Sequence, residues 1–317
     1  MKFSAKYTFT IFLLLGDIYA NAQSDVSMNT YWYNRDNYNP AAIARTEYLY
    51  IFSNIRQQWI GIDGAPKVFN VQASEYIHKL HSAFGLSFIS DEIGVTQTLG
   101  SKLSYAFRLS PDDNWSLSLG LSGGYFSHSI NGSIYEANTD EDPSISYEND
   151  KIKRPDANVG FEFQNQHLIA GVSSTHLFSP FVSIDNQIYS NHRYAYVIYK
   201  NNNPPLFNYS AGLQTINSND YTIIEGNILF RFKRTNGLKE GPVERFDVGL
   251  TYNSSHQLIV LLGINVTSKL RIGYAFDQSF SRDLYQNSTH ELMMEYRIPN
   301  KASSTRQRCG EDFFWYR

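Results

Sequence analysis

Apolar and polar side chains alternate along most of the chain, from Thr46 onward, in segments of about ten residues separated by turn-forming residues. In one segment Leu117, Leu119 and Leu121 alternate with serine and glycine. Because successive side chains of a strand point to opposite faces, each such segment has one apolar face and one small or charged face. Strands of soluble β-sandwiches are usually shorter, so this pattern favours a membrane barrel with a polar lumen.

The chain is predicted to be all-β, a transmembrane antiparallel β-barrel of about 14 strands, an even number as expected in the bacterial outer membrane. The predicted strands are 47–60, 67–77, 80–90, 97–109, 115–131, 156–164, 167–176, 191–200, 207–217, 222–233, 243–252, 256–265, 268–277 and 290–298.

The connections between these strands are sorted by length. The longest, at 132–155, 177–190 and 278–289, all follow an odd-numbered strand, whereas the tight ones at 110–114, 164–167 and 265–268 all follow an even-numbered strand. With a periplasmic N-terminus, the long connections face the exterior and the short ones the periplasm, as in outer-membrane barrels. The connection 233–242 is long on the inner side, which indicates either a misjudged strand boundary or a contact point.

The N-terminus has the pattern of a signal peptide. Lys2 and Lys6 precede an apolar run at 7–15, and Ala20-Asn21-Ala22 forms a cleavage site, so residues 1–22 are predicted to be removed after Ala22. A short transmembrane anchor is the alternative, but the apolar run is too short to span a bilayer. The protein is therefore predicted to be exported to the outer membrane, with 23–45 as an irregular periplasmic lead-in and 46–299 as the barrel.

Composition agrees with this prediction. The 317 residues are 42% hydrophobic and 15% aromatic, which favours strands, and the formal charge of −3 gives no basic footprint for nucleic-acid binding. The chain has a single cysteine, Cys309, so no internal disulfide framework is expected.

Sequence motifs for catalysis or cofactor binding are absent. The eight histidines lack zinc-ligand spacing, and there is no nucleophile elbow, phosphate loop or dinucleotide fingerprint, so no catalytic residue, cofactor or metal site is predicted. The acidic stretch from Asp140 to Asp142, with Glu148 and Asp150, lacks the residue order of a calcium loop and is interpreted as a solvated loop.

Two groups of residues inside the predicted strands call for an interpretation. Gly120, Gly123 and Gly124 are predicted to mark a bulge or bend at a barrel corner. Five arginines are expected to face the lumen, where they form either a path for anions or peptides or ion pairs that fill the lumen. These arginines are Arg56, Arg108, Arg193, Arg231 and Arg271.

The first predicted hairpin, with strands at 46–55 and 67–77, has a distinctive tip at 56–67. Gly61 and Gly64 suit positive φ, Pro66 restarts the chain where no ladder donor is needed, and Trp59 suits an aromatic girdle at the membrane boundary. We interpret the tip as a structural motif rather than a binding site. Its residues are Arg56, Gln58, Trp59, Gly61, Asp63, Gly64, Ala65 and Pro66.

This tip, together with Asn39-Pro40-Ala41, resembles the start of the PorP/SprF family of outer-membrane proteins, which serve type IX secretion and gliding in the Bacteroidota. Weaker blocks at 85–94, 105–109, 155–160 and 273–277 also fit, so the resemblance covers nearly the whole mature chain.

The resemblance implies a non-enzymatic barrel that assists secretion or surface attachment of type IX cargo. The implied partners are cargo proteins with a C-terminal sorting domain, other type IX secretion or gliding components and the lipid bilayer. The family carries no catalytic residues. The alternative function is a passive or hydrophobic-solute transport barrel, porin-like or fatty-acid-transporter-like. A barrel protease or lipase would need an acid/base pair or a Ser/His/acid set, and none occurs at fixed spacing.

The last residues, 300–317, depart from the family pattern. They form a polar tail that ends in an aromatic cluster at Phe313, Phe314, Trp315 and Tyr316. Exposed aromatic clusters often mark interaction sites, so this tail is either a periplasmic docking segment or a frayed terminus.

Overall fold

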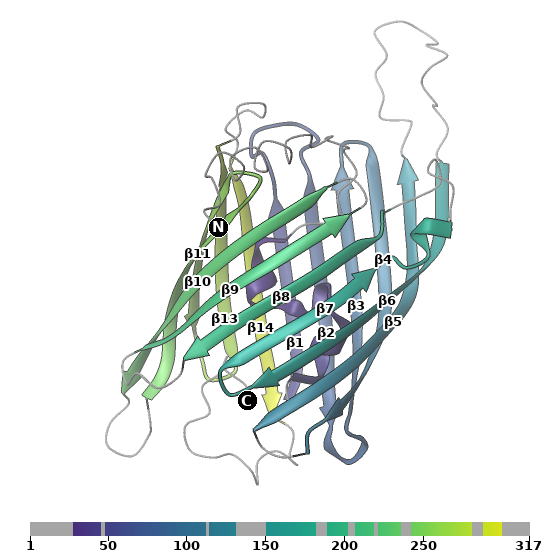
Figure 1. Ribbon diagram of the computed structural model, residues 1–317. Helices are drawn as coiled ribbons and strands as arrows, with labels where there is room; N and C mark the ends of the chain where they lie inside the picture. The colour runs from purple at the N-terminus through teal and green to yellow at the C-terminus, as the bar shows by residue number, and fades with distance from the viewer. Residues whose placement is uncertain are drawn as a thin grey trace, which may run out of the picture.

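Fourteen antiparallel strands close into a barrel in the computed structural model, because β1 pairs with β14 as well as with β2 (Figure 1). Every other strand pairs with its two neighbours in the sequence. The structure describes residues 28–45, 48–111, 114–130, 150–181, 189–201, 207–218, 221–235, 242–280 and 288–299. Both the predicted fold class and the predicted number of strands are confirmed.

The strands are β1 (Tyr48–Gln57), β2 (Lys67–Ile77), β3 (Ser82–Ile93), β4 (Thr96–Leu109), β5 (Trp115–Ile130), β6 (Asp150–Asn165), β7 (Leu168–Thr175), β8 (His192–Asn201), β9 (Phe207–Ser218), β10 (Thr222–Thr235), β11 (Pro242–Asn253), β12 (Gln257–Asn265), β13 (Leu270–Ser279) and β14 (Thr289–Pro299). Short 3-10 turns η4 (His78–Leu80) and η6 (Ser179–Phe181) lie in two of the connections.

Each predicted strand corresponds to one observed strand, and the largest boundary difference is in β6. This strand begins at Asp150, so the last six residues of the predicted loop 132–155 belong to the wall. The exceptional inner connection is also shorter than expected, since β10 continues to Thr235 and β11 begins at Pro242. The length of that connection was therefore overestimated, because the end of β10 was placed too early and the start of β11 too late.

The two faces of the wall differ as the alternation predicts. Leu119 and Leu121 in β5 are 57% and 60% exposed on the outer face, whereas Ser118 and Ser122, which flank them, are buried on the lumen side. An apolar outer band around a polar interior is the pattern of an outer-membrane barrel. No helix in the described part of the chain is long and apolar enough to cross a membrane.

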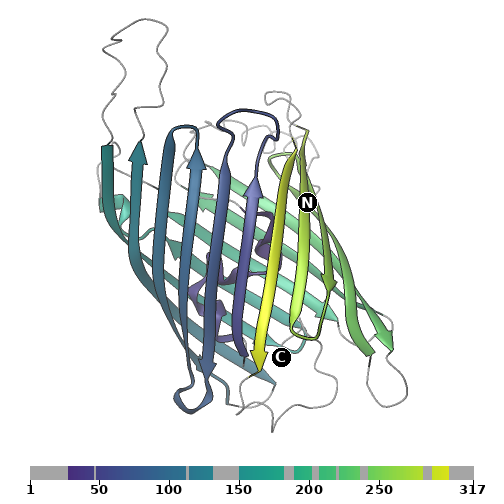
Figure 2. The same cartoon turned by 180° about the vertical axis from the view of Figure 1, so that it is seen from behind.

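An N-terminal segment fills the interior of this barrel. Three 3-10 turns, η1 (Asn29–Trp32), η2 (Arg35–Asn37) and η3 (Pro40–Arg45), lie within the wall (Figure 2). We call residues 28–45 the plug. The predicted periplasmic location of 23–45 is therefore wrong for the described residues, since the plug is almost entirely buried. Its many hydroxyl, amide and charged groups can be buried because polar wall residues bind them.

Of the bulge or bend predicted at the glycines of β5, the bulge is wrong. The ladders of β5 with β4 and with β6 run without a register shift, so these glycines mark no bulge. Instead, a Cβ atom at Gly120 would overlap the plug backbone at Pro40 and Ala41. Gly120 therefore gives the plug room to lie against the wall.

Candidate functional site in the barrel lumen

The plug owes its shape to side chains that bond to its own backbone. The Asn34 side chain accepts a 3.0 Å hydrogen bond from the Asp36 amide and caps η2. The Asn39 side chain accepts one from the Ala41 amide, also at 3.0 Å, and Pro40 begins η3. Asparagine favours such local bonds, and proline at the first helical position loses no donor that the helix needs. The sequence thus folds into short turns that fit a narrow lumen.

One end of the plug is held by Glu291 of β14. The carboxylate accepts hydrogen bonds from the Asn29 amide at 2.8 Å and from the Thr30 hydroxyl. It also accepts a 2.8 Å bond from Asn54 of β1, and the Arg56 guanidinium lies 3.5 Å away. Arg56 of the predicted hairpin motif therefore lies in the lumen, beside the plug.

The next plug residues bind carboxylates of β10 and β11. The Trp32 indole donates a 2.5 Å hydrogen bond to Glu225, and the Tyr33 hydroxyl donates a 2.6 Å bond to Asp247. Arg271 also binds Asp247 at 2.6 Å, and its guanidinium lies 4.0 Å from the centre of the Tyr33 ring. Buried charges of this kind are tolerated when they are paired and hydrogen-bonded.

Arg35 anchors the centre of the plug to β6. Its guanidinium forms a buried ion pair with Glu162 at 2.8 Å. The same carboxylate accepts a hydrogen bond from the Tyr196 hydroxyl of β8, which in turn accepts a 2.7 Å bond from the Asn39 side chain. The plug therefore contacts opposite sides of the barrel through polar groups.

Aromatic packing reinforces these bonds. The Tyr38 ring lies 4.9 Å from those of Tyr31 and Tyr194 and 5.6 Å from that of Tyr196. Two more wall glycines admit the plug, because a Cβ atom at Gly160 would overlap the Asn39 side chain and one at Gly212 would overlap the Trp32 ring. Close packing of this kind makes each filled position sensitive to added volume.

Within the plug, Asp36 and Arg45 form a further buried ion pair at 3.1 Å. Burial raises the pKa of the Asp36 carboxyl above its ordinary value, although Arg45 and Arg35 both oppose that shift. Burial alone would lower the pKa of Arg45, but Asp36 and Tyr50 raise it. This pair braces η2 against the end of η3.

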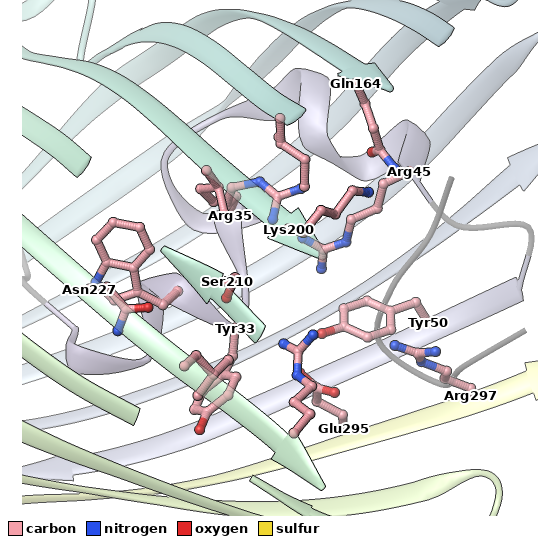
Figure 3. Close-up of a pocket in the computed structure, with 15 residues that line it drawn as sticks. Tyr33, Arg35, Arg45, Tyr50, Gln164, Lys200, Ser210, Asn227, Glu295 and Arg297 are labelled. Atoms are coloured by element: carbon pink, nitrogen blue, oxygen red, sulfur yellow. The ribbon is translucent and has the colours of Figure 1, made fainter. Parts of the chain in front are cut away.

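A cavity of about 50 Å³ lies between the plug and the wall (Figure 3). Arg35, Arg45 and Lys200 gather on one side of it, and Tyr50, Glu295 and Arg297 come from β1 and β14. Gln164, Ser210, Asn227 and Arg231 complete the polar lining. The cavity is small, and the apolar side chains of Ile169, Ile198 and Leu229 line it together with these charged and polar groups.

The lumen arginines divide into confirmed and wrong predictions. Arg56, Arg231 and Arg271 are buried inside the barrel, and Arg108 donates a 3.2 Å bond to the Ala44 carbonyl of the plug. The prediction that Arg193 faces the lumen is wrong, since Arg193 is exposed on the outer face while its neighbours His192 and Tyr194 are buried. The reason is strand register, because a shift of one residue reverses the face of every side chain.

For two of these arginines the ion-pair interpretation holds. Arg56 lies near the carboxylates of Glu291 and Asp277, at 3.5 and 3.9 Å, and Arg271 pairs with Asp247 and Glu295. These ion pairs lie in the lumen beside the plug.

The other residues of the hairpin motif lie away from the plug. Gly61 and Gly64 adopt positive φ as predicted, at 95° and 73°, and the Gln58 amide donates to the Pro66 carbonyl at 3.0 Å. Trp59 has a φ of 49° and lies beyond the end of β1, in the turn. Asp63 is exposed in the same turn, and Ala65 is buried. Membership of Trp59 in an aromatic girdle stays a prediction.

Several predicted features lie outside the described residues. These are the signal peptide 1–22, the acidic stretch 140–148, the tail 300–317 with its aromatic cluster at 313–316, and Cys309. Across the described ranges, no group of three or more His, Cys, Asp or Glu side chains could hold a metal ion.

Sequence reasoning missed the wall residues that bind the plug. They are carboxylates on the lumen faces of their strands: Glu162, Glu225, Asp247 and Glu291. A signal was present in the alternating pattern, because acidic residues recur at its polar positions, and a buried carboxylate there requires a partner.

Among solved structures, the barrel is similar to several outer-membrane proteins. The CymD monoaromatic hydrocarbon channel is 9% identical, with a TM-score of 0.49 over 89% of this chain and 95% of that one. The Pseudomonas putida toluene transporter TodX is 9% identical, with a TM-score of 0.47 over 88% and 95%. Omp33 of Acinetobacter baumannii is 11% identical, with a TM-score of 0.47 over 80% and 99%.

Comparison of the sequence alone gives a family. No curated protein matches the chain significantly. The family model of the type IX secretion system membrane protein PorP/SprF, in contrast, matches residues 20–296. That range includes the plug and nearly all of the barrel, and it confirms the resemblance noted in the sequence. The chain belongs to the PorP/SprF family of type IX secretion system membrane proteins.

Proposed function

We propose that this protein is a non-enzymatic accessory barrel that assists the secretion or surface attachment of type IX cargo. Family membership supports the link to type IX secretion. The observation that carries the accessory role is the plug, whose residues bond to Glu162, Glu225, Asp247 and Glu291 on four different strands. A lumen occupied in this way leaves partner recognition to the rims and connections of the barrel.

The plug also bears on the alternative of passive solute transport. A transport barrel needs a continuous path through its lumen, and here the path crosses buried ion pairs such as Arg35 with Glu162. Removing one partner of a buried ion pair costs about 3–5 kcal/mol because the other charge stays uncompensated. Release of the plug would break this ion pair together with the hydrogen bonds to Glu225, Asp247 and Glu291, so we propose that the barrel is closed at rest.

The proposed partners are cargo proteins that carry a C-terminal sorting domain, and other components of the secretion or gliding machinery. The odd-to-even connections lie at one end of the barrel and include the longest ones, between β5 and β6 and between β7 and β8 (Figure 1). Following the usual asymmetry of outer-membrane barrels, we assign this end to the cell exterior. The tail 300–317 would then extend into the periplasm as a docking segment.

Deletion of the gene tests the accessory role directly. Surface and secreted proteins of the deletion strain are identified by mass spectrometry and compared with those of a complemented strain. Gliding is scored in parallel. We expect specific cargo proteins with sorting domains to be lost from the surface. An unchanged set of surface proteins would overturn the proposal.

Planar-bilayer recordings test the closed lumen separately. The purified full-length protein should give no steady conductance, whereas a passive transport barrel would give stable open channels. A steady open pore would favour the transport alternative over the accessory role.

A further inference from the structure

A pair of exposed lysines lies on the outward face of β6, near the barrel end that we assign to the exterior (Figure 1). Lys151 and Lys153 occupy the same face of the strand as Val159, an exposed outward residue, because alternate residues of a strand share a face. The ladder of β6 with β5 runs without a shift and places Ser129 opposite Lys151 and Ser127 opposite Lys153. These two cations and two hydroxyl groups form one patch, which we call the lysine patch.

The lysine patch begins where the apolar band of the barrel ends. On β5 the outward residues from Trp115 to Tyr125 are aromatic, leucine or glycine, and the next outward residue is Ser127. Trp115 stacks on Phe163 of β6, with ring centroids 6.3 Å apart, and Tyr125 lies at the opposite end of this run. The run from Trp115 to Tyr125 corresponds to about 33 Å of strand, or about 25 Å across a membrane at a tilt of about 40°. That is the usual height of the apolar band, so the lysine patch lies at the level of the lipid headgroups.

Outward carboxylates are distant from the lysine patch in the described wall. The outward positions of β4, β5, β6 and β7 contain neither Asp nor Glu. The first outward carboxylate along the ladder is Glu92 of β3, which is reached from Lys151 through Ser129 and Gln97. At about 4.8 Å per strand, Glu92 lies about 14 Å away, beyond the screening length of about 8 Å at physiological salt. The outward wall around the patch is therefore net positive.

The backbone of β6 adds donors to the lysine patch. The ladder of β6 with β7 covers six residue pairs, whereas the ladder with β5 covers sixteen. The Leu177 amide donates to the Ala157 carbonyl at 2.9 Å, so the backbone groups of Ala157 and of every second residue before it face away from β5. The amides of Lys151 and Lys153 therefore lie on an edge of β6 that has no ladder partner among the described residues.

Phosphate is the anion that suits such a patch at this level of the wall. Lysine binds phosphate as a point charge, and clusters of basic residues beside a membrane recognise anionic headgroups. The outer leaflet of a bacterial outer membrane consists largely of phosphorylated glycolipids, so the surroundings supply this anion. Charged residues on a strand edge have a second explanation, since they discourage pairing with another chain. Keeping other strands away needs no phosphate, so lipid binding separates the two roles.

We propose that the lysine patch binds the phosphate of a glycolipid in the outer leaflet. The ammonium groups of Lys151 and Lys153 supply the charge, and the serine hydroxyls and the edge amides donate to the phosphate oxygens. The ring of Tyr125, which is 66% exposed one outward position below Ser127, packs against the rest of the lipid. This inference goes beyond the proposed function, because it depends on the assignment of the exterior end and on no role in secretion.

Native mass spectrometry of the full-length protein in detergent measures the binding, with phosphorylated lipid A as the probe. We expect one lipid A per wild-type barrel, and an affinity about tenfold lower or less for lipid A from which the phosphate has been removed. Inorganic phosphate in excess should not displace the lipid, because the lipid also contacts the wall below the patch. Equal binding of the two forms of lipid A would overturn the proposal, and so would displacement by inorganic phosphate, which would indicate a site for the free ion.

A double variant locates the site. Lys151→Gln combined with Lys153→Gln removes both charges from exposed positions, so its Tm in detergent without lipid should equal that of the wild type. Its affinity for phosphorylated lipid A should fall about tenfold or more, because two cations no longer face the phosphate. Unchanged binding would leave these lysines only the role of keeping other strands from the edge of β6, and would contradict the proposal.

The matched control is Lys67→Gln combined with Lys79→Gln, which removes the same number of charges from two other exposed lysines. Lys67 lies on β2 opposite Glu92, and Lys79 lies in η4 at the other end of the barrel. This variant should bind phosphorylated lipid A as the wild type does. An equal loss of affinity in the two double variants would show a general attraction to charge, and would overturn a site at the lysine patch.

Discussion

The hydroxyl group of Tyr33 in the plug donates a 2.6 Å hydrogen bond to the carboxylate of Asp247 in β11. The same carboxylate accepts two bonds from Arg271, whose guanidinium covers the Tyr33 ring. All three side chains are buried. A wall ion pair that would otherwise face the lumen is thus completed by a residue from 214 positions earlier in the chain.

Replacing this hydroxyl should weaken the folded state. In Tyr33→Phe the ring still packs against Arg271, but the Asp247 carboxylate loses one donor. Because loss of a hydrogen bond to a buried charged group costs about 1–3 kcal/mol, the urea midpoint of unfolding in detergent should fall. Tyr125→Phe is the control, since Tyr125 is 66% exposed on the outer face and should behave like the wild type. Equal midpoints for both variants would show that the bond contributes nothing.

Added volume at Gly212 should displace the plug. A Cβ atom there would overlap the Trp32 ring, so Gly212→Leu forces Trp32 out of its position. We expect the variant to give ion conductance in planar bilayers where the wild type gives none.

Gly226→Leu in β10 provides the matched comparison, because a Cβ atom at Gly226 would meet nothing within 4 Å. Its conductance should equal that of the wild type. A Gly212→Leu barrel that assembles normally and stays closed would show that the plug tolerates this loss of space.

Neutralising Glu162 should release the centre of the plug. Glu162→Gln leaves the buried Arg35 charge uncompensated and weakens the bond from Tyr196, so the free energy of unfolding should fall by about 3 kcal/mol or more. Protease sensitivity of the plug should rise in parallel. Glu92→Gln, at an exposed carboxylate bonded to Gln97, should change neither quantity. Equal stability of Glu162→Gln and Glu92→Gln would rule out an anchoring role for the Arg35 pair.

A substitution in the hairpin tip should lower the amount of assembled barrel without opening the lumen. Gly64 has a φ of 73°, and a Cβ atom would lie 3.2 Å from Gly94 in the turn between β3 and β4. The Gly94 amide donates to the Gly64 carbonyl. Gly64→Val is therefore strained in two ways, and the amount of folded barrel in the outer membrane should drop several-fold. Barrels that do fold should stay closed and should export cargo at the wild-type rate per molecule. Normal barrel levels with lost export would instead indicate a binding role for the tip.

Strand positions were predictable because two signals coincide, the alternation of apolar and polar side chains and the turn-forming residues that end it. In β5, for example, leucine alternates with serine and glycine, and the pattern ends at turn residues on both sides. The beginning of β6 was missed because Lys151, Lys153 and Pro155 resemble a loop. Those residues belong to the wall because they continue the ladder with β5, and a ladder with a neighbouring strand is a non-local interaction that local patterns do not report.

The plug was not predicted for a related reason. Its turns are short and have no periodicity, so residues such as Tyr31, Trp32 and Tyr33 resemble an irregular lead-in. What places them inside the barrel is the match between their polar groups and carboxylates that lie far along the chain, such as Glu291. The register of β8 shows the same limit, since Arg193 and His192 are both polar, and only packing decides which of them is buried.

The contacts of Glu291 have a consequence for the order of biogenesis. The plug directly precedes β1, whereas Glu291 belongs to β14, the last strand, and these two strands form the seam that closes the barrel. Asn29 and Thr30 can reach their carboxylate only after β14 has arrived beside β1. The plug, which precedes every strand in the chain, is therefore among the last segments to reach its final position, and its arrival braces the seam from within.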